Sequence, residues 1–223
     1  MATPLRLLSP LEARVLGVLV EKQHTVADSY PLSLNALVLG CNQKTARDPV
    51  IAATDAEVLV AIDGLKALAL VVEVSGSRVA RFEHNFKRVL GVPGQSEALL
   101  TLLMLRGPQT AAELRASTER LHRFADISAV EGFLDELAVR EPPLVVRLPR
   151  APGAREPRWA HLLCGPVDAT QTGAAGADRR GEAGQSQEAQ ARIERLESEV
   201  ALLRASVEQL CRELGLSPPG QAQ

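Results

Sequence analysis

The 223-residue sequence predicts an α+β fold, mainly helical with small β-hairpins, built from two tandem units and a C-terminal helix. Three observations predict this organisation. The order of N-capping residue, amphipathic helix and paired β-rich segments occurs twice. A stretch rich in small and polar residues, 166–186, has the composition of a flexible linker. Beyond it, apolar residues recur at the heptad spacing of a coiled coil.

The first unit, residues 1–90, is expected to contain three helices and a hairpin. Ser9-Pro10-Leu11-Glu12 combines a capping box with proline at the first helical position, which marks a helix start. Ser33 is placed to cap a second helix and Thr54 a third. Two β-rich segments within 70–82 then flank a Ser-Gly-Ser turn, so they predict a hairpin.

The second unit, residues 91–165, repeats this order with loops of different length. Ser96 is expected to cap its first helix, and Thr110 opens a second with another capping box. Ser128 is expected to open the third helix. Two β-rich segments within 144–163 flank a Pro/Gly-rich turn and predict the second hairpin.

Three helices followed by a hairpin "wing" make a winged helix, a form of helix-turn-helix module that most often binds DNA. The expected hairpins and the loop before the first unit's third helix carry basic residues. A guanidinium on a projecting hairpin can reach phosphates without reading sequence. The candidate nucleic-acid-binding residues are Lys44, Arg47, Arg78, Arg81, Lys87, Arg88, Arg147 and Arg158, with Arg150 and Arg155 beside them on the second hairpin. Any single arginine could instead be a solvated strand charge.

The third helices argue against the ordinary mode of DNA reading. A helix that enters the major groove should present Arg, Lys, Asn or Gln near its N-terminus. Both of these helices present carboxylates there, and carboxylates repel phosphates. The acidic residues are Asp55, Glu57 and Asp63 in the first unit, and Glu131, Asp135 and Glu136 in the second.

Composition sets further limits on function. The formal net charge is −2, so a DNA-binding surface would have to be a local patch. The four histidines have no partner at metal-ligand spacing, so we expect no bound metal. Because no nucleophile motif or phosphate-binding loop occurs either, we expect no catalytic activity and no cofactor. Cys41, Cys164 and Cys211 are far apart and suit a reducing compartment. With no membrane span and no signal peptide in the sequence, a cytoplasmic location is expected.

Residues 187–214 predict a coiled-coil helix, followed by a disordered tail, 215–223. The residues at a and d positions are Ile193, Leu196, Val200, Leu203, Val207, Leu210 and Leu214. β-branched residues at a and leucine at d favour a parallel pair, so a homodimer is expected. The alternative is an amphipathic helix that folds back onto its own units.

Several segments resemble the YceH-like family, a group of uncharacterised bacterial tandem winged-helix proteins. The resemblance lies in Leu8–Lys22, Tyr30–Leu37, Cys41–Pro49 and Leu105–Thr110. It implies a tandem winged-helix fold in a cytoplasmic protein, and supplies no activity. The family pattern commonly has Ser-Asn where this chain has Thr45-Ala46, so a contact made by that asparagine would be missing here.

Two hypotheses follow from the sequence. The first is a DNA-associated protein, a transcriptional regulator that contacts phosphates through its wings and dimerises through the C-terminal helix. The alternative is a non-catalytic protein–protein interaction module that uses winged-helix surfaces. The clustered arginines favour the first, and the acidic third helices with the near-neutral charge favour the second.

Overall fold

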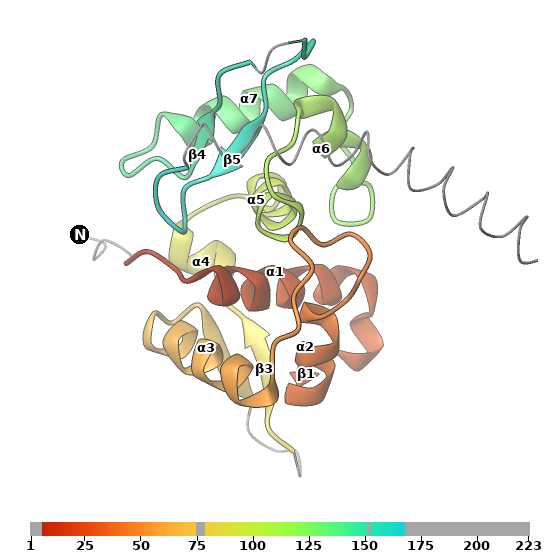
Figure 1. Cartoon of the computed structure of the whole chain (residues 1–223), viewed down its shortest axis with the longest axis vertical. Coiled ribbons are helices and arrows are strands. Elements are labelled where there is room, and N and C mark those ends of the chain that lie inside the picture. Colours follow the sequence, from red (N-terminus) through yellow and green to blue (C-terminus); the bar gives the residue numbers. More distant parts are fainter. Residues whose placement is uncertain (1–5, 75–78, 151–152, 168–223) are drawn as a thin grey trace, which may run out of the picture. The chain divides into compact units, whose positions relative to one another are not determined.

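The computed structural model describes residues 6–74, 79–150 and 153–167 (Figure 1). The elements of the first unit are α1 (Pro10–Thr25), the 3₁₀ turn η1 (Ala27–Ser29), β1 (Leu32–Ser33), α2 (Leu34–Cys41), α3 (Asp55–Ala67), β2 (Val71–Val74), β3 (Arg81–His84) and α4 (Phe86–Leu90). Those of the second are α5 (Gly94–Arg106), α6 (Ala111–Ser117), α7 (Ile127–Ala138), β4 (Val145–Arg147) and β5 (Trp159–His161). Mixed helices and small antiparallel sheets confirm the predicted α+β class.

Local capping decides where several helices begin. Ser9, Thr54 and Thr110 each accept a hydrogen bond from the backbone three residues on, and a glutamate there completes each capping box. These three starts are confirmed, as is Ser33 before α2.

Two expected helix starts are wrong by two or three residues. Ser96 lies inside α5 and is only 1% exposed; the helix begins at Gly94, where the extended backbone of Pro93 serves as the N-cap. Asp126, rather than Ser128, caps α7 by accepting from the backbone N–H of Ala129. Aspartate is as good a cap as serine, so the prediction of Ser128 overlooked an equally suitable cap two residues earlier.

Each unit carries an antiparallel hairpin beside its helices. In the first, β3 pairs with β2 and also with β1, giving the strand order β1-β3-β2. Leu32 faces Phe82 across the outer pair. In the second, β4 pairs with β5, and a single bridge between Gln109 and Trp159 stands where the third strand would lie. The second unit therefore repeats the first with its outer strand reduced to one bridge.

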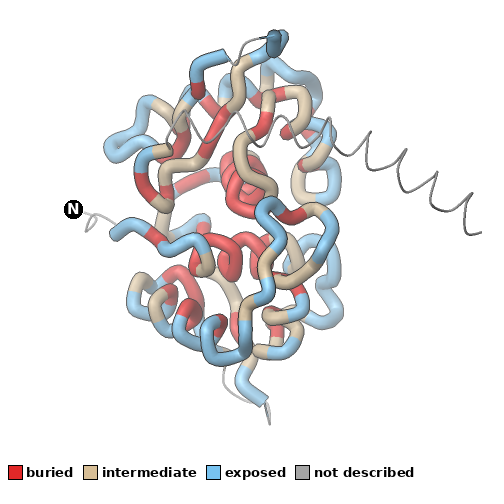
Figure 2. Tube along the Cα trace, in the orientation of Figure 1, coloured by how far each residue is buried: buried red, intermediate tan, exposed pale blue. Residues whose placement is uncertain are grey.

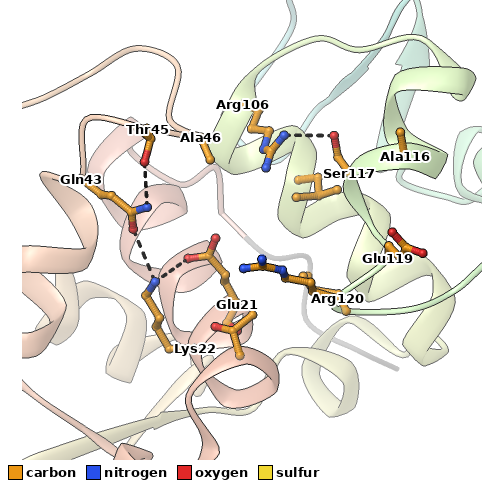
Figure 3. Close-up of a pocket in the computed structure, with 13 residues that line it drawn as sticks. Glu21, Lys22, Gln43, Thr45, Ala46, Arg106, Ala116, Ser117, Glu119 and Arg120 are labelled. Carbon is orange, nitrogen blue, oxygen red and sulfur yellow. Dashed lines mark hydrogen bonds and ion pairs between the residues drawn. The ribbon is translucent and has the colours of Figure 1, made fainter.

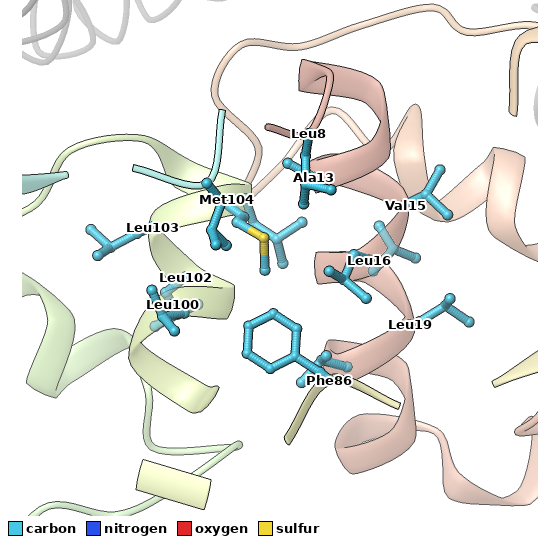
Figure 4. Close-up of a cluster of buried hydrophobic side chains, with 14 of the residues drawn as sticks. Leu8, Ala13, Val15, Leu16, Leu19, Phe86, Leu100, Leu102, Leu103 and Met104 are labelled. Atoms are coloured by element: carbon cyan, nitrogen blue, oxygen red, sulfur yellow. The ribbon is translucent and has the colours of Figure 1, made fainter. Parts of the chain in front are cut away.

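The two units pack against each other through α1 and α5. Residues 12–20 of α1 and 96–105 of α5 are all buried, because each helix covers its own unit on one side and the other unit on the other (Figures 1 and 2). Leucine, methionine and phenylalanine side chains fill the space between these helices (Figure 4). Both helices carry apolar residues on most of their sides, as expected for helices buried on two faces.

Backbone hydrogen bonds also join the units. The N–H of Leu8 donates to the carbonyl of Leu163 at 2.8 Å, and that of Asp48 to Leu105 at 2.9 Å. The described residues accordingly form one compact body around a shared core. Most of the expected linker, the coiled-coil helix 187–214 and the tail lie outside the described residues. Within the described part, the helices are too short or too polar to cross a bilayer.

Candidate functional site

Arg47 lies in the interior, and the structure corrects its expected role. Its side chain is 0% exposed and forms a two-pronged ion pair with Glu21, at 2.6 and 3.2 Å. The same guanidinium donates to the carbonyl oxygens of Gly40 and Ala46, at 3.1 and 2.9 Å. Because no face of this guanidinium is open to a phosphate, Arg47 is not part of the candidate nucleic-acid interface.

Arg81 and Arg158 occupy corresponding places in the two hairpins and make corresponding bonds. Arg81 donates to the carbonyl of Pro31 at 2.7 Å and to that of Ser29 at 3.3 Å. Arg158 donates to the carbonyl of Pro108, also at 2.7 Å, and to the carboxylate of Glu113 at 3.2 Å. In each case the proline lies 50 residues earlier in the chain.

These two arginines therefore anchor a hairpin strand to the connection that precedes the second helix of its own unit. Charge-assisted hydrogen bonds of this kind are among the stronger ones in proteins. Both guanidiniums are engaged by acceptors of the protein itself, and their contact with DNA stays a prediction. The same arginine-to-proline bond thus occurs in both units. The spacing of residues in the sequence did not indicate this bond.

The remaining predicted residues do not form one patch. Lys44 is exposed in the loop after α2, and Arg88 is exposed on α4. Lys87, on α4, lies 3.6 Å from the buried carboxylate of Glu97. Arg147 is exposed on β4, its guanidinium 5.9 Å from the ring centre of Trp159. Arg78 and the seven expected coiled-coil positions, Ile193, Leu196, Val200, Leu203, Val207, Leu210 and Leu214, lie outside the described residues.

The second hairpin presents most of its arginines to solvent. Arg147 ends β4, and Arg150 and Arg155 follow in the connection to β5; all three are exposed. Glu156 is an exposed acid in the same connection. This hairpin, rather than the first, is the stronger candidate for backbone contact with a nucleic acid among the described residues.

The exposed faces of the third helices carry the expected carboxylates. Asp55, Glu57 and Asp63 are exposed on α3, as are Glu131, Asp135 and Glu136 on α7. On α3 the acids flank apolar side chains, with Val60 72% exposed and Leu59 41% exposed. A groove of about 560 Å³ lies beside Val60, between α3 and the start of α1, with Leu11 and Ala56 in its lining. These helix surfaces suit a protein partner better than a phosphate.

The loop from Asn42 to Pro49 is held by long-range hydrogen bonds. The side-chain amide of Asn42 accepts from the N–H of Ala53 and donates to its carbonyl, both at 2.8 Å. Arg14, a buried residue of α1, donates to the carbonyl oxygens of Cys41 and Pro49. Thus Asn42 and Arg14 fix both ends of the loop and set the entry to α3. Arg14 could not be recognised from the sequence, because its partners lie 27 and 35 residues further along the chain.

Ala46 has a positive φ of 58°, which places it in the left-handed region. Asparagine is one of the few side-chain-bearing residues favoured in that region. A family preference for asparagine at this position is therefore explained by backbone conformation. No lost contact needs to be invoked for Ala46.

A polar cleft of about 490 Å³ lies between the units, beside this loop (Figure 3). Its first wall is the C-terminal end of α1 with Gln43, Thr45 and Ala46; its second is α5, α6 and the turn after α6. The charged lining residues are Glu21, Lys22, Arg106, Glu119 and Arg120.

The partly buried carboxylate of Glu21 is ionised at one edge of this cleft. Burial acts to raise its pKa, but hydrogen bonding and charge attraction from Arg47 outweigh burial, and the pKa is lowered. Lys22 also pairs with Glu21 at 3.2 Å. Glu21 is thus paired with two cations, Arg47 beneath the cleft and Lys22 within it.

Cys41 is a core residue, as its place on the apolar face of α2 predicted. It is 0% exposed, and burial raises the pKa of its thiol to about 11. A thiol that stays protonated is a poor nucleophile. Thiol chemistry at Cys41 is therefore disfavoured.

Comparisons with known proteins place the chain in a family. The family model described as "Protein of unknown function, DUF480" matches residues 8–154. The chain belongs to this family. A UPF0502 protein from Methylibium petroleiphilum is 68% identical over 95% of this chain and 92% of its own length. UPF0502 proteins from Burkholderia multivorans (65%, over 98% and 94%) and Leptothrix cholodnii (64%, over 94% and 96%) are similarly close. The resemblance to an uncharacterised bacterial family is confirmed.

Proposed function

We propose that this DUF480-family protein is a cytoplasmic, non-catalytic tandem winged-helix protein that associates with DNA, as a transcriptional regulator, through its second hairpin. The observation that carries the proposal is the exposure of Arg147, Arg150 and Arg155 on that hairpin. Each unit also has the helix–helix–helix–hairpin order of a winged helix.

The proposed contact is led by the hairpin. Carboxylates on α7 would face the phosphates if that helix entered the major groove, and the repulsion would oppose binding. A hairpin that projects its arginines toward the backbone avoids this conflict. Such contacts give affinity without sequence reading, and their strength falls steeply with salt because bound counterions are released.

We also propose that the protein is a homodimer joined by a coiled coil of residues 187–214. The heptad supports it, with β-branched residues at most a positions and leucine at d. Light scattering is expected to give the mass of a dimer for the full chain, and of a monomer when Leu203 and Leu210 are replaced by serine. Equal masses would refute the coiled-coil dimer.

The test of DNA association is fluorescence anisotropy of a mixed-sequence duplex, titrated with protein at low and near-physiological salt. Nonspecific binding with Kd of roughly 10⁻⁴ to 10⁻⁶ M is expected. In the double variant Arg150→Ala, Arg155→Ala, the slope of log affinity against log salt should shrink by about 2, one for each lost phosphate contact.

The matched control is Arg120→Ala with Arg123→Ala. It removes two exposed arginines from the turn before α7, so net charge changes equally. We expect its salt slope to stay close to that of the unaltered protein. Equal losses in both double variants would mean that net charge, and not the hairpin, governs the binding.

A protein-interaction module is the second candidate, favoured by the groove beside α3. Its lining from Leu11, Ala56 and Val60 is apolar, and Glu57 borders it. Acids around an apolar strip fit an amphipathic helix with basic flanks. The test compares partner capture by Val60→Asp and Val139→Asp, since Val139 is equally exposed but lies at the end of α7. Selective loss with Val60→Asp, together with no DNA binding at low salt, would favour this function.

A further inference from the structure

The inter-repeat cleft has an excess of positive charge once its buried ion pair is counted. Lys22, Arg106 and Arg120 line it, against the carboxylates of Glu21 and Glu119. Arg47 lies beneath Glu21 and neutralises it through the two-pronged ion pair. Among the described residues at the cleft, four cations, Arg47 included, therefore stand against two carboxylates.

The cations come from both walls of the cleft. Lys22 extends from α1 and is largely shielded, with 22% of its side chain exposed. The guanidinium of Arg120 extends across from the turn after α6 toward α1 (Figure 3). Arg106, on α5, donates to the hydroxyl of Ser117 at 3.0 Å, which fixes its position at the far wall.

Neutral hydrogen-bonding groups complete the lining. The amide of Gln43 accepts from Lys22 at 3.4 Å and donates to the hydroxyl of Thr45 at 3.2 Å. These bonds hold the lysine and the loop at the mouth of the cleft. Cations with amide and hydroxyl groups around them are the usual partners of oxyanions, and guanidinium geometry matches carboxylate and phosphate oxygens.

The loop that forms one wall is held in a strained conformation. Ala46, a lining residue, has φ of 58°, and its carbonyl is held by the buried Arg47. Non-glycine residues in this region are strained, and they cluster at ligand sites where the surrounding structure holds them. Arg47, which failed as a phosphate contact, here supports the wall of a cleft.

We propose that this cleft binds a small multivalent oxyanion, a compound bearing phosphate or carboxylate groups, through Lys22, Arg106 and Arg120. Its volume of about 490 Å³ lies within the range of small-molecule sites, which often form where two domains meet. The site is separate from the second hairpin and does not depend on DNA association.

The test is isothermal titration calorimetry of the full chain with pyrophosphate and, separately, with citrate. Binding of either probe is expected, and the better probe identifies phosphate or carboxylate as the preferred group. In Arg120→Ala the affinity should fall by about tenfold or more, since a charge-assisted hydrogen bond is lost. Arg120→Gln serves as a second variant if the alanine form is poorly folded.

Arg123→Ala is the matched control, because Arg123 is exposed three residues farther along and does not line the cleft. Its affinity for the probe should equal that of the unaltered protein, as should that of Arg150→Ala with Arg155→Ala. If neither probe gave a heat of binding at concentrations up to about 10 mM, well above a millimolar Kd, the proposal would be overturned. Equal affinities in Arg120→Ala and Arg123→Ala would also overturn it.

Discussion

Arg47 and Lys44 are three residues apart but occupy opposite environments, one buried and the other exposed. We expect Arg47→Ala to lower the free energy of unfolding by about 3–5 kcal/mol, because it leaves the largely shielded carboxylate of Glu21 without its main partner. Lys44→Ala should change it by less than about 0.5 kcal/mol. Urea unfolding of both variants measures the difference. A small effect of Arg47→Ala would contradict the structural role.

We expect His84 to make the stability of the folded protein depend on pH. Its side chain is buried; burial, with the nearby charges of Lys87 and His24, lowers its pKa to about 4. The unfolded chain takes up that proton near pH 6.5. Between these values the unfolded state binds more protons, so the contribution of His84 is complete above pH 6.5 and is lost as the pH falls toward 4.

We expect the free energy of unfolding to fall across this window by at most about 1.4 kcal/mol per pH unit on account of His84. His84→Gln, which can keep a hydrogen bond to Gln23, should give a flatter curve between pH 6.5 and 4. Urea titrations at several pH values provide both curves. Parallel curves for the two proteins would exclude His84 as a source of the slope.

The basic residues show what local pattern can and cannot predict. The hairpin arginines were recognisable as a group, but their separate roles depend on partners far away in the chain. Arg81 and Arg158 each bind a carbonyl 50 residues earlier, and Arg47 binds Glu21 on α1. Because no spacing rule relates these positions, sequence alone did not distinguish anchoring arginines from exposed ones.

Two glycines within helices should respond oppositely to the same change. A Cβ on Gly40 of α2 would come within 2.6 Å of a methyl group of buried Val18 on α1. Overpacking of this kind lowers stability by about 1–3 kcal/mol. A Cβ on Gly132 of α7 would meet nothing within 4 Å, so Gly132→Ala should raise stability by about 0.5–1 kcal/mol through helix propensity. Thermal unfolding of both variants is the measurement, and shifts of the same sign would contradict this packing of α1 and α2.

At this scale the helices were the best-predicted part of the fold. Ser9, Thr54 and Thr110 marked their helix starts because a capping box is local and lies within four residues. The end of α3 was harder to predict from the sequence. Its Schellman-type hydrogen bonds, from Ala69 to Lys66 and from Leu70 to Leu65, require a positive φ at Ala69, where glycine would be usual.

On the scale of the molecule, the two repeats were predictable but their packing was not. The apolar residues of α1 and α5 indicated burial without indicating that each helix serves two units. The polar cleft beside α1 follows from this packing, because its walls come from both units. Residues that meet only through that packing, such as Lys22 and Arg120, could not be grouped from their spacing in the sequence.

Arginines on the same hairpin are expected to have different tasks, and one crossed comparison distinguishes them. Arg158→Ala should lower the free energy of unfolding by about 1–3 kcal/mol, through its lost hydrogen bonds, while duplex affinity stays unchanged. The double variant Arg150→Ala, Arg155→Ala should do the reverse, with unaltered stability and weaker, less salt-dependent binding.

The decisive measurement is therefore duplex anisotropy on these two variants, beside their urea unfolding curves. We expect stability to be lost in one variant and DNA affinity in the other. Weaker DNA binding with intact stability in Arg158→Ala, or unaltered DNA binding in the double variant, would contradict this division of tasks.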